Sequence, residues 1–219
     1  VRRLIPYSML SEAVVRWAMV KNLFLPGAGA SANFWKPVAA EARLDGVFFA
    51  WPGLGLERPA PGIESIDDLI ALVAEEITEP VNIIAQSMGG FIALKLALKF
   101  PNLVKRLVLA VTSGGIPVAD LGGSEWRANY FDAFPNAATW ITMPVSDLSD
   151  LIPSINAPTL LLWGDSDPIS PVAVGERLLA LIPSAKLCIF PGADHNLAQT
   201  HAQAVSVELK RHLVTDKPC

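Results

Sequence analysis

Cysteine, charge and long apolar runs are all scarce in this chain of 219 residues. Its two cysteines, Cys188 and Cys219, are too few for a secreted disulfide framework and are typical of a reducing compartment. Cys188 lies in an apolar run, so we expect a buried small hydrophobe there. No apolar run approaches the ~20 residues of a bilayer-spanning helix, and Pro6 interrupts the run after Arg2 and Arg3 too early for a secretory signal. We therefore expect a cytoplasmic protein that does not associate with membranes.

The little charge that is present is of mixed sign and slightly acidic. The formal net charge is −4, and no basic run is longer than two residues, so nucleic-acid binding is excluded. Hydrophobic residues make up 52% of the chain, which suits a sheet covered on both faces by helices, where strands need not alternate. The length favours a single domain over residues 1–219.

Short apolar, β-rich runs alternate with helical patterns from Val20 onward. Strands are expected at 20–25, 47–50, 81–86, 105–111, 159–164 and 186–190, and helices at 33–43, 65–78, 88–100, 171–182 and 201–213. This alternation predicts an α/β fold with a mostly parallel sheet and helices on both faces. Ser65 and Asp68 form a capping-box variant at the start of the second helix. The helix at 88–100 is apolar almost all round and should be the most buried.

Two segments depart from the alternation. Residues 1–18 have no clean period and are expected to be a loosely packed extension, even sequence upstream of a start at Met19; an extra edge strand or hairpin is the alternative. Residues 116–152 contain many turn-forming residues and one amphipathic stretch. The residues sharing its helical face are Trp126, Asn129, Tyr130, Ala133 and Phe134. An insertion between two strands predicts a short helical lid, with a connecting helix packed on the core as the alternative.

The strongest chemical signal is the run Ala-Gln-Ser-Met-Gly-Gly around Ser87, where an apolar strand meets a helix. A serine on such a sharp turn needs small residues two positions before and after it, because the chain passes close to itself. Ala85 fills the first small position, where the usual pattern has glycine, and Gly89 fills the second. A serine nucleophile also needs an imidazole to take its proton and a carboxylate to orient that imidazole.

With this elbow the sequence resembles the α/β-hydrolase family, over nearly the whole chain after Met19. The resemblance implies the chain order serine, then Asp or Glu, then histidine. It points to His195, directly after the run KLCIF, as the base, whereas His201 and His212 are expected to be surface or packing residues. Asp165 and Asp167 both follow the run TLLLWG; the family pattern selects Asp167 as the acid and leaves Asp165 as a turn residue bonded to its own backbone.

Acyl transfer also needs hydrogen-bond donors for the developing oxyanion. The N–H of Met88 begins a helix, where free N–H groups favour negative charge. The second donor is expected to be the N–H of Ala28, in the loop Pro-Gly-Ala-Gly-Ala-Ser after the first strand. Pro26 stands there in place of the family's usual histidine. No Lys-Ser or Lys-Thr follows these glycines, so a phosphate-binding loop is not expected.

The expected function is hydrolysis of a small or medium acyl ester by a carboxylesterase-like serine hydrolase. Serine at the elbow disfavours the halide and epoxide chemistry of family members that use aspartate there. Neither a metal nor a cofactor is expected, because no cluster with metal-ligand spacing occurs. Trp126, Tyr130 and Phe131 suggest an apolar pocket for the acyl group. The compact lid resembles that of small bacterial carboxylesterases, including those acting on pimeloyl-carrier-protein methyl ester.

Two other functions stay open on the same residues. One is a lyase or carbon–carbon bond hydrolase using the same triad, for which Arg58 and Arg127 are the available cations. The other is a binding module without catalysis. The expected partner is a small acyl substrate, and the expected state is a monomer or a homodimer.

Overall fold

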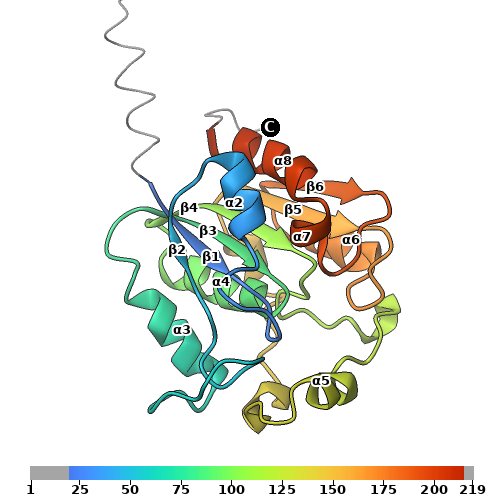
Figure 1. The fold of residues 1–219 in the computed structure, drawn as a ribbon. Helices are drawn as coiled ribbons and strands as arrows, with labels where there is room; N and C mark the ends of the chain where they lie inside the picture. The colour runs from blue at the N-terminus through green and yellow to red at the C-terminus, as the bar shows by residue number, and fades with distance from the viewer. Residues whose placement is uncertain (1–19, 215–219) are drawn as a thin grey trace, which may run out of the picture.

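A six-stranded parallel sheet forms the centre of the protein in the computed structural model, which describes residues 20–214 (Figure 1). The predicted extension at residues 1–18 lies outside the described residues. The strands are β1 (Lys21–Leu25), β2 (Val47–Phe48), β3 (Val81–Gln86), β4 (Val104–Ala110), β5 (Thr159–Gly164) and β6 (Ala185–Phe190). Their order is β2-β1-β3-β4-β5-β6, and every pair is parallel. The predicted α/β fold is therefore confirmed.

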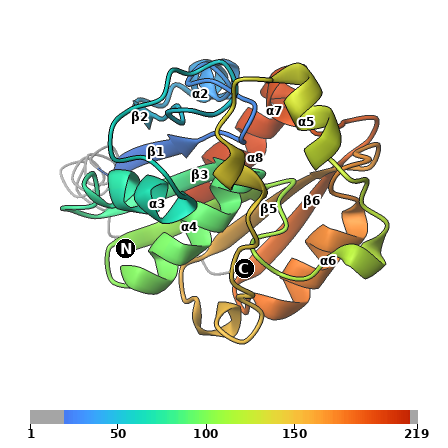
Figure 2. The same cartoon turned by 90° about the horizontal axis from the view of Figure 1, so that it is seen from below.

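Helices cover both faces of this sheet. They are α2 (Lys36–Ala42), α3 (Ile66–Ala74), α4 (Met88–Lys99), α5 (Arg127–Ala133), α6 (Val172–Leu181), α7 (Leu197–Thr200) and α8 (Ala202–Val214). Helices α2, α7 and α8 lie on one face, and α3, α4 and α6 lie on the other (Figure 2). Because all strands run the same way, the loops after them meet at one edge of the sheet. Within residues 20–214, no helix has the length and apolarity to cross a membrane.

Local sequence explains where the helices begin. The Ser65 hydroxyl oxygen accepts the Asp68 N–H at 3.2 Å, so the predicted N-cap is confirmed. The Asp68 carboxylate in turn accepts the Ser65 hydroxyl at 2.7 Å and the Glu64 N–H at 3.0 Å. Helix α2 begins at Lys36, three residues later than predicted, with Pro37 in the first turn, where its missing N–H costs nothing.

The burial of an element depends on how many other elements surround it. Helix α4 is the most buried helix, as predicted, since eight of its twelve residues are buried. The prediction for Cys188 is wrong in degree: it is half-buried, with its thiol 3.9 Å from a carboxylate oxygen of Glu208. The reason is that β6 is the last strand of the described sheet and Ile189 beside it is 46% exposed.

The segment between β4 and β5 contains α5 and three short 3-10 helices at Ala119–Leu121, Thr139–Thr142 and Ile152–Ser154. The residues predicted to share one helical face of its amphipathic stretch differ in burial. Tyr130 is buried, but Asn129 and Ala133 are exposed. Helix α5 has only seven residues, too few turns for the full periodic face to meet the core. That this segment works as a lid stays a prediction.

Candidate active site

Ser87 occupies a strained turn between β3 and α4. Its φ of 53° and ψ of −122° lie where side chains are disfavoured, at a cost of about 1–3 kcal/mol. The surroundings hold the turn in place. The Ser87 N–H donates to the Ala110 carbonyl at 3.0 Å, and the Ser87 carbonyl accepts the Gly90 N–H at 2.9 Å and the Thr112 hydroxyl at 2.6 Å.

The two small positions beside Ser87 differ in how much space they offer. Ala85 is fully buried within β3, where it pairs with Leu25, so the sheet accommodates its methyl group. A Cβ at Gly89 would lie 2.6 Å from the Pro26 carbonyl oxygen and 2.8 Å from that of Leu25. Glycine is therefore required after the serine, while alanine is tolerated before it.

His195 and Asp167 lie together at the same edge of the sheet. Asp167 follows β5 and is 4% exposed, and its Oδ2 lies 2.7 Å from Nδ1 of His195, which follows β6. Its Oδ1 accepts the N–H groups of Ile169 at 2.8 Å and Ser170 at 3.1 Å. Both carboxylate oxygens are thus engaged, which fixes the orientation of the group toward the imidazole.

Asp165 makes contacts that differ from the predicted ones. Its carboxylate accepts the N–H of Gly192 at 2.7 Å, and so ties the loop after β5 to the loop after β6. It also accepts the neighbouring Ser166 hydroxyl at 3.0 Å. The prediction of a turn residue bonded to its own backbone missed this contact, because the long-range donor could not be located from sequence.

The two remaining histidines lie apart from this pair, on the α7–α8 side. His201 ends α7, and its Nδ1 lies 2.8 Å from the Thr200 hydroxyl. On α8, burial and the nearby Arg106 guanidinium lower the pKa of His212 to about 4. Both fit the predicted surface or packing roles.

Two buried tryptophans hold the loop after β1. The indole N–H of Trp35 donates to the Leu25 carbonyl at 3.0 Å, and that of Trp51 donates to the Pro26 carbonyl at 2.9 Å. Both carbonyls are the ones that approach Gly89, so the indoles fix the wall against which the elbow packs. Pro26, which stands where the family usually has histidine, thus contributes its carbonyl to this wall.

The candidate oxyanion donors flank Ser87. Met88 is the first residue of α4, so its N–H has no acceptor within the helix. A Cβ at Gly27 would lie 3.1 Å from Cβ of Ser87, which places the loop of Ala28 directly beside the serine. The Ala28 carbonyl accepts the Tyr130 hydroxyl at 3.0 Å. That hydroxyl also accepts the Gly55 N–H at 2.9 Å, and burial raises the pKa of Tyr130, which favours its protonated form as donor.

Aromatic side chains from α5 cover this loop. Tyr130 packs edge-on against Trp126 and Phe131, with ring centroids 5.7 Å and 5.6 Å apart. Phe134 packs against Gly29 of the loop. Trp126 and Phe131 are half-buried, whereas Tyr130 is 8% exposed. Of the three predicted substrate-contacting residues, Trp126 and Phe131 therefore keep partly free apolar faces, and Tyr130 is held by its hydroxyl.

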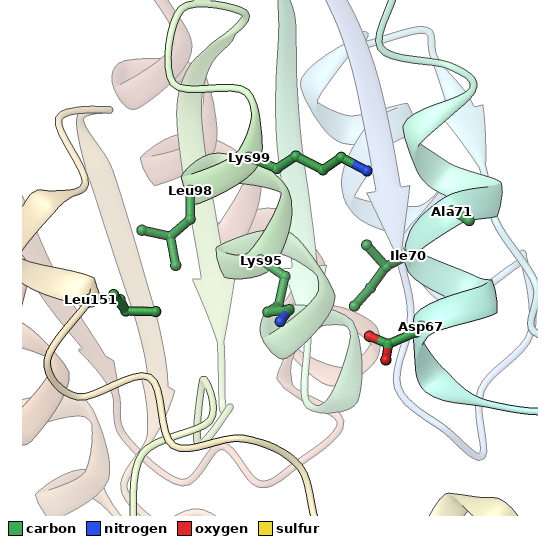
Figure 3. A pocket seen from close by; sticks show the side chains of 7 residues that line it. All are labelled: Asp67, Ile70, Ala71, Lys95, Leu98, Lys99 and Leu151. Atoms are coloured by element: carbon green, nitrogen blue, oxygen red, sulfur yellow. The ribbon is translucent and has the colours of Figure 1, made fainter.

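Two hollows differ in their relation to these residues. One is lined by residues of the loop after β1 on one side and, on the other, by Asn196 and Gln199, which follow His195 in the sequence; the loop residues are Gly29, Ala30, Ser31, Asn33 and Phe34. The second lies along α4, which carries Lys95 and Lys99: Asp67 and Ile70 of α3 lie on one side of that helix, and Leu151 lies on the other (Figure 3). Neither hollow is lined by a predicted site residue. In the described part of the chain, no group of three or more His, Cys, Asp or Glu could hold a metal ion.

Several residues that support the site escaped the sequence analysis. Thr112 follows β4 and so lies at the catalytic edge, and a polar residue at the end of an apolar strand was a usable signal. Trp35 and Trp51 gave no such signal, because a tryptophan that supports the site cannot be told in the sequence from one that only packs in the core. Gln86 was read only as part of the elbow, although its side chain reaches the loop of His195.

Comparisons with known proteins identify the family of this chain. Residues 23–143 match the model of the alpha/beta hydrolase family, and residues 124–202 match a second model described as alpha/beta hydrolase fold. The chain therefore belongs to the α/β-hydrolase family.

Its relatives include hydrolases of more than one kind. A 2-hydroxy-6-oxononadienedioate/2-hydroxy-6-oxononatrienedioate hydrolase of Cupriavidus pinatubonensis is 27% identical, over 82% of this chain and 80% of that protein. A thermophilic esterase from Thermogutta terrifontis has a similar structure, with a TM-score of 0.71, 20% identity and coverage of 90% and 91%. A meta-cleavage product hydrolase from Pseudomonas fluorescens gives a TM-score of 0.68, 19% identity and coverage of 88% and 90%. The protein is a hydrolase of this fold.

Proposed function

We propose that this hydrolase cleaves small or medium carboxylic esters through an acyl-enzyme on Ser87. The observation that carries the proposal is the His195–Asp167 pair, 2.7 Å apart, at the edge of the sheet where Ser87 sits on its strained turn. A buried carboxylate that fixes an imidazole beside a serine elbow is the arrangement that nucleophilic acyl transfer needs.

The reaction divides into two half-reactions with the same groups. The hydroxyl oxygen of Ser87 attacks the ester carbonyl while Nε2 of His195 takes its proton, and Asp167 stabilises the resulting imidazolium. The N–H groups of Met88 and Ala28 bind the oxyanion of the tetrahedral intermediate. Collapse expels the alcohol, which receives the proton from His195. Water deprotonated by His195 then attacks the acyl-enzyme, and the carboxylic acid leaves as Ser87 regains its proton.

The surroundings support an apolar acyl group and a polar leaving group. Tyr130 and Phe134 pack on the loop that holds Ala28, and the half-buried rings of Trp126 and Phe131 pack against Tyr130, which suits a short apolar acyl chain. The hollow whose lining includes Asn196, the residue after His195, has hydroxyl and amide side chains in its wall, among them Ser31 and Asn196 itself. An alcohol leaving group accepts its proton from His195, so a polar hollow there fits its departure.

Carbon–carbon bond hydrolysis is the second candidate, because the Cupriavidus relative acts on a dienedioate by its name. Such a dianionic substrate calls for a cation in the site. The two predicted candidates, Arg58 and Arg127, are both exposed. Arg127 is also paired with Glu125 at 3.2 Å and stacked 5.0 Å from the Trp126 ring. These exposed positions favour the ester substrate.

Two measurements test the function. The first is covalent labelling of the folded protein with a fluorophosphonate, with Ser87→Ala as the control. An adduct on Ser87 that the variant lacks supports a serine hydrolase, and an unlabelled folded protein contradicts it. The second compares p-nitrophenyl acetate and butyrate with a vinylogous diketone. Faster turnover of the diketone would overturn the ester assignment and leave the nucleophile intact. A cytoplasmic location, a monomeric or homodimeric state and the triad itself stay predictions.

A further inference from the structure

Gln86, the residue before the candidate nucleophile, reaches across the site to the loop of the candidate base. The side chain is 3% exposed, and its Nε2 donates to the main-chain carbonyl of His195 at 3.2 Å. Its Oε1 is buried and has no hydrogen-bond partner among residues 20–214. A buried amide oxygen without a partner costs about 1–3 kcal/mol, so this placement is maintained against a penalty.

The orientation of the amide is fixed by what it faces. Turning it over would set Oε1 against the His195 carbonyl, which is also an acceptor, and the bond would be lost. Oε1 instead points to the loop after β1, where a Cβ at Gly27 would collide with it. One side chain therefore contacts both the loop of the base and the loop of the candidate oxyanion donor.

The other bonds of the His195 loop lead elsewhere. The Ala193 carbonyl accepts the Ser166 N–H at 3.0 Å, and the Gly192 N–H donates to Asp165 at 2.7 Å. The imidazole itself is bonded to Asp167. All three contacts attach the His195 loop to the residues after β5. They do not fix the distance between the His195 loop and the turn after β3 that carries Ser87. Gln86 supplies a direct bond from β3 to the main chain of His195.

We propose that Gln86 is a positioning residue, whose side-chain amide holds the main chain of His195 in register with Ser87. The inference rests on the proposed function, since it assigns His195 the role of base toward Ser87. It predicts that Gln86 acts on the chemical step more than on substrate affinity, because the amide touches the frame of the site rather than the substrate.

The test replaces Gln86 with methionine, which keeps the length and bulk of the side chain but has no N–H to donate. The matched control is Asn82→Leu on the same strand, because Asn82 is also buried and its Nδ2 donates to Oδ1 of Asn22 at 3.0 Å, away from the site. Both variants lose one buried amide from β3. For each we measure kcat and KM on p-nitrophenyl butyrate per fluorophosphonate-titrated site, Tm, and the ring 1H–15N signals of His195, assigned with His195→Gln.

Gln86→Met should lower kcat by about ten- to a hundredfold, since small misplacements of reacting groups cost rates of this order. KM should stay within about threefold, and the His195 ring signals should shift. Asn82→Leu should lower Tm and leave kcat and these signals unchanged. If Gln86→Met keeps the wild-type kcat per site and the wild-type ring signals, the proposal is overturned. If the wild type is not labelled at all but the ring signals still shift in Gln86→Met alone, Gln86 positions His195 and the proposed esterase function fails.

Discussion

His212 on α8 should lower the free energy of unfolding of this protein in acid, by an amount that follows from its pKa. His212 is half-buried, and its Nε2 is fully buried without a hydrogen-bond partner among the described residues. Burial, with the charges of Arg106 on β4 and Lys186 on β6, lowers its pKa from 6.5 to about 4. The folded state therefore keeps the ring neutral at a pH where the unfolded chain has already bound a proton.

The sign and size of the effect follow from proton linkage. Above pH 6.5 neither state is protonated and His212 costs nothing; as the pH falls from 6.5 to about 4, the unfolded state binds the extra proton and stability declines. The shift corresponds to a loss of about 3 kcal/mol once both states are protonated, and to about 2 kcal/mol already at pH 5. At pH 5 most ordinary carboxylates are still ionised, so the histidine contribution can be separated from theirs.

Urea unfolding at pH 7.5 and pH 5 measures this loss directly, with His212→Gln as the comparison. Glutamine is polar and does not titrate, so the variant should lose about 2 kcal/mol less than the wild type between the two pH values. An NMR titration of the His212 ring in the folded protein provides an independent check. Equal losses in the two proteins, within about 0.5 kcal/mol, would refute the assignment of acid sensitivity to this residue.

Four substitutions test the site itself. Ser87→Ala should abolish ester hydrolysis and change the free energy of unfolding by less than about 0.5 kcal/mol, measured by urea unfolding, because both residues carry a Cβ in the same strained turn. Asp167→Asn should lower kcat by roughly 10³–10⁴-fold, since it disturbs the imidazole tautomer. Asp165→Asn keeps an oxygen for its loop bond and should cost less than about tenfold; reversed magnitudes would show that the acid is misassigned. Thr112→Val removes the hydroxyl donor of the Ser87 carbonyl and should cost about 1–2 kcal/mol in urea unfolding; an unchanged free energy would mean that the elbow does not depend on this bond.

What could be predicted from sequence was local or periodic. The strands were legible because each is a short apolar run, and the Ser65 cap because its partner is three residues away. That an aspartate after β5 approaches His195 followed from their places after successive strands of one parallel sheet, whereas the choice of Asp167 over Asp165 came from the family resemblance. Hydrogen bonds between loops that are distant in the chain could not be predicted in this way. The contact of Asp165 with Gly192 spans 27 residues, and that of Gln86 with His195 spans 109, and no pattern in one sequence encodes either partner.

The degree of burial at the margins was also beyond prediction. Cys188 sits in a run as apolar as any central strand, yet it is half-buried because β6 has a neighbouring strand on one side only in the described sheet. Asn129 follows the helical period of its stretch and is nevertheless exposed. In both cases the outcome depends on which element lies next to the residue in space.

The Tyr130 hydroxyl connects α5 to the loop that carries the candidate oxyanion donor Ala28. It bonds the carbonyl of Ala28 at 3.0 Å and the N–H of Gly55 at 2.9 Å, so α5 is fastened to two loops at once. We expect α5 to resist moving as a free flap, because any outward displacement must break these bonds or drag the peptide of Ala28 with it. An acyl chain long enough to press on the aromatic rings of α5 would then disturb the donor geometry at the reacting carbonyl. The length of the acyl chain would then affect the chemical step at the scissile bond. An acyl chain that is too long would lower kcat rather than raise KM.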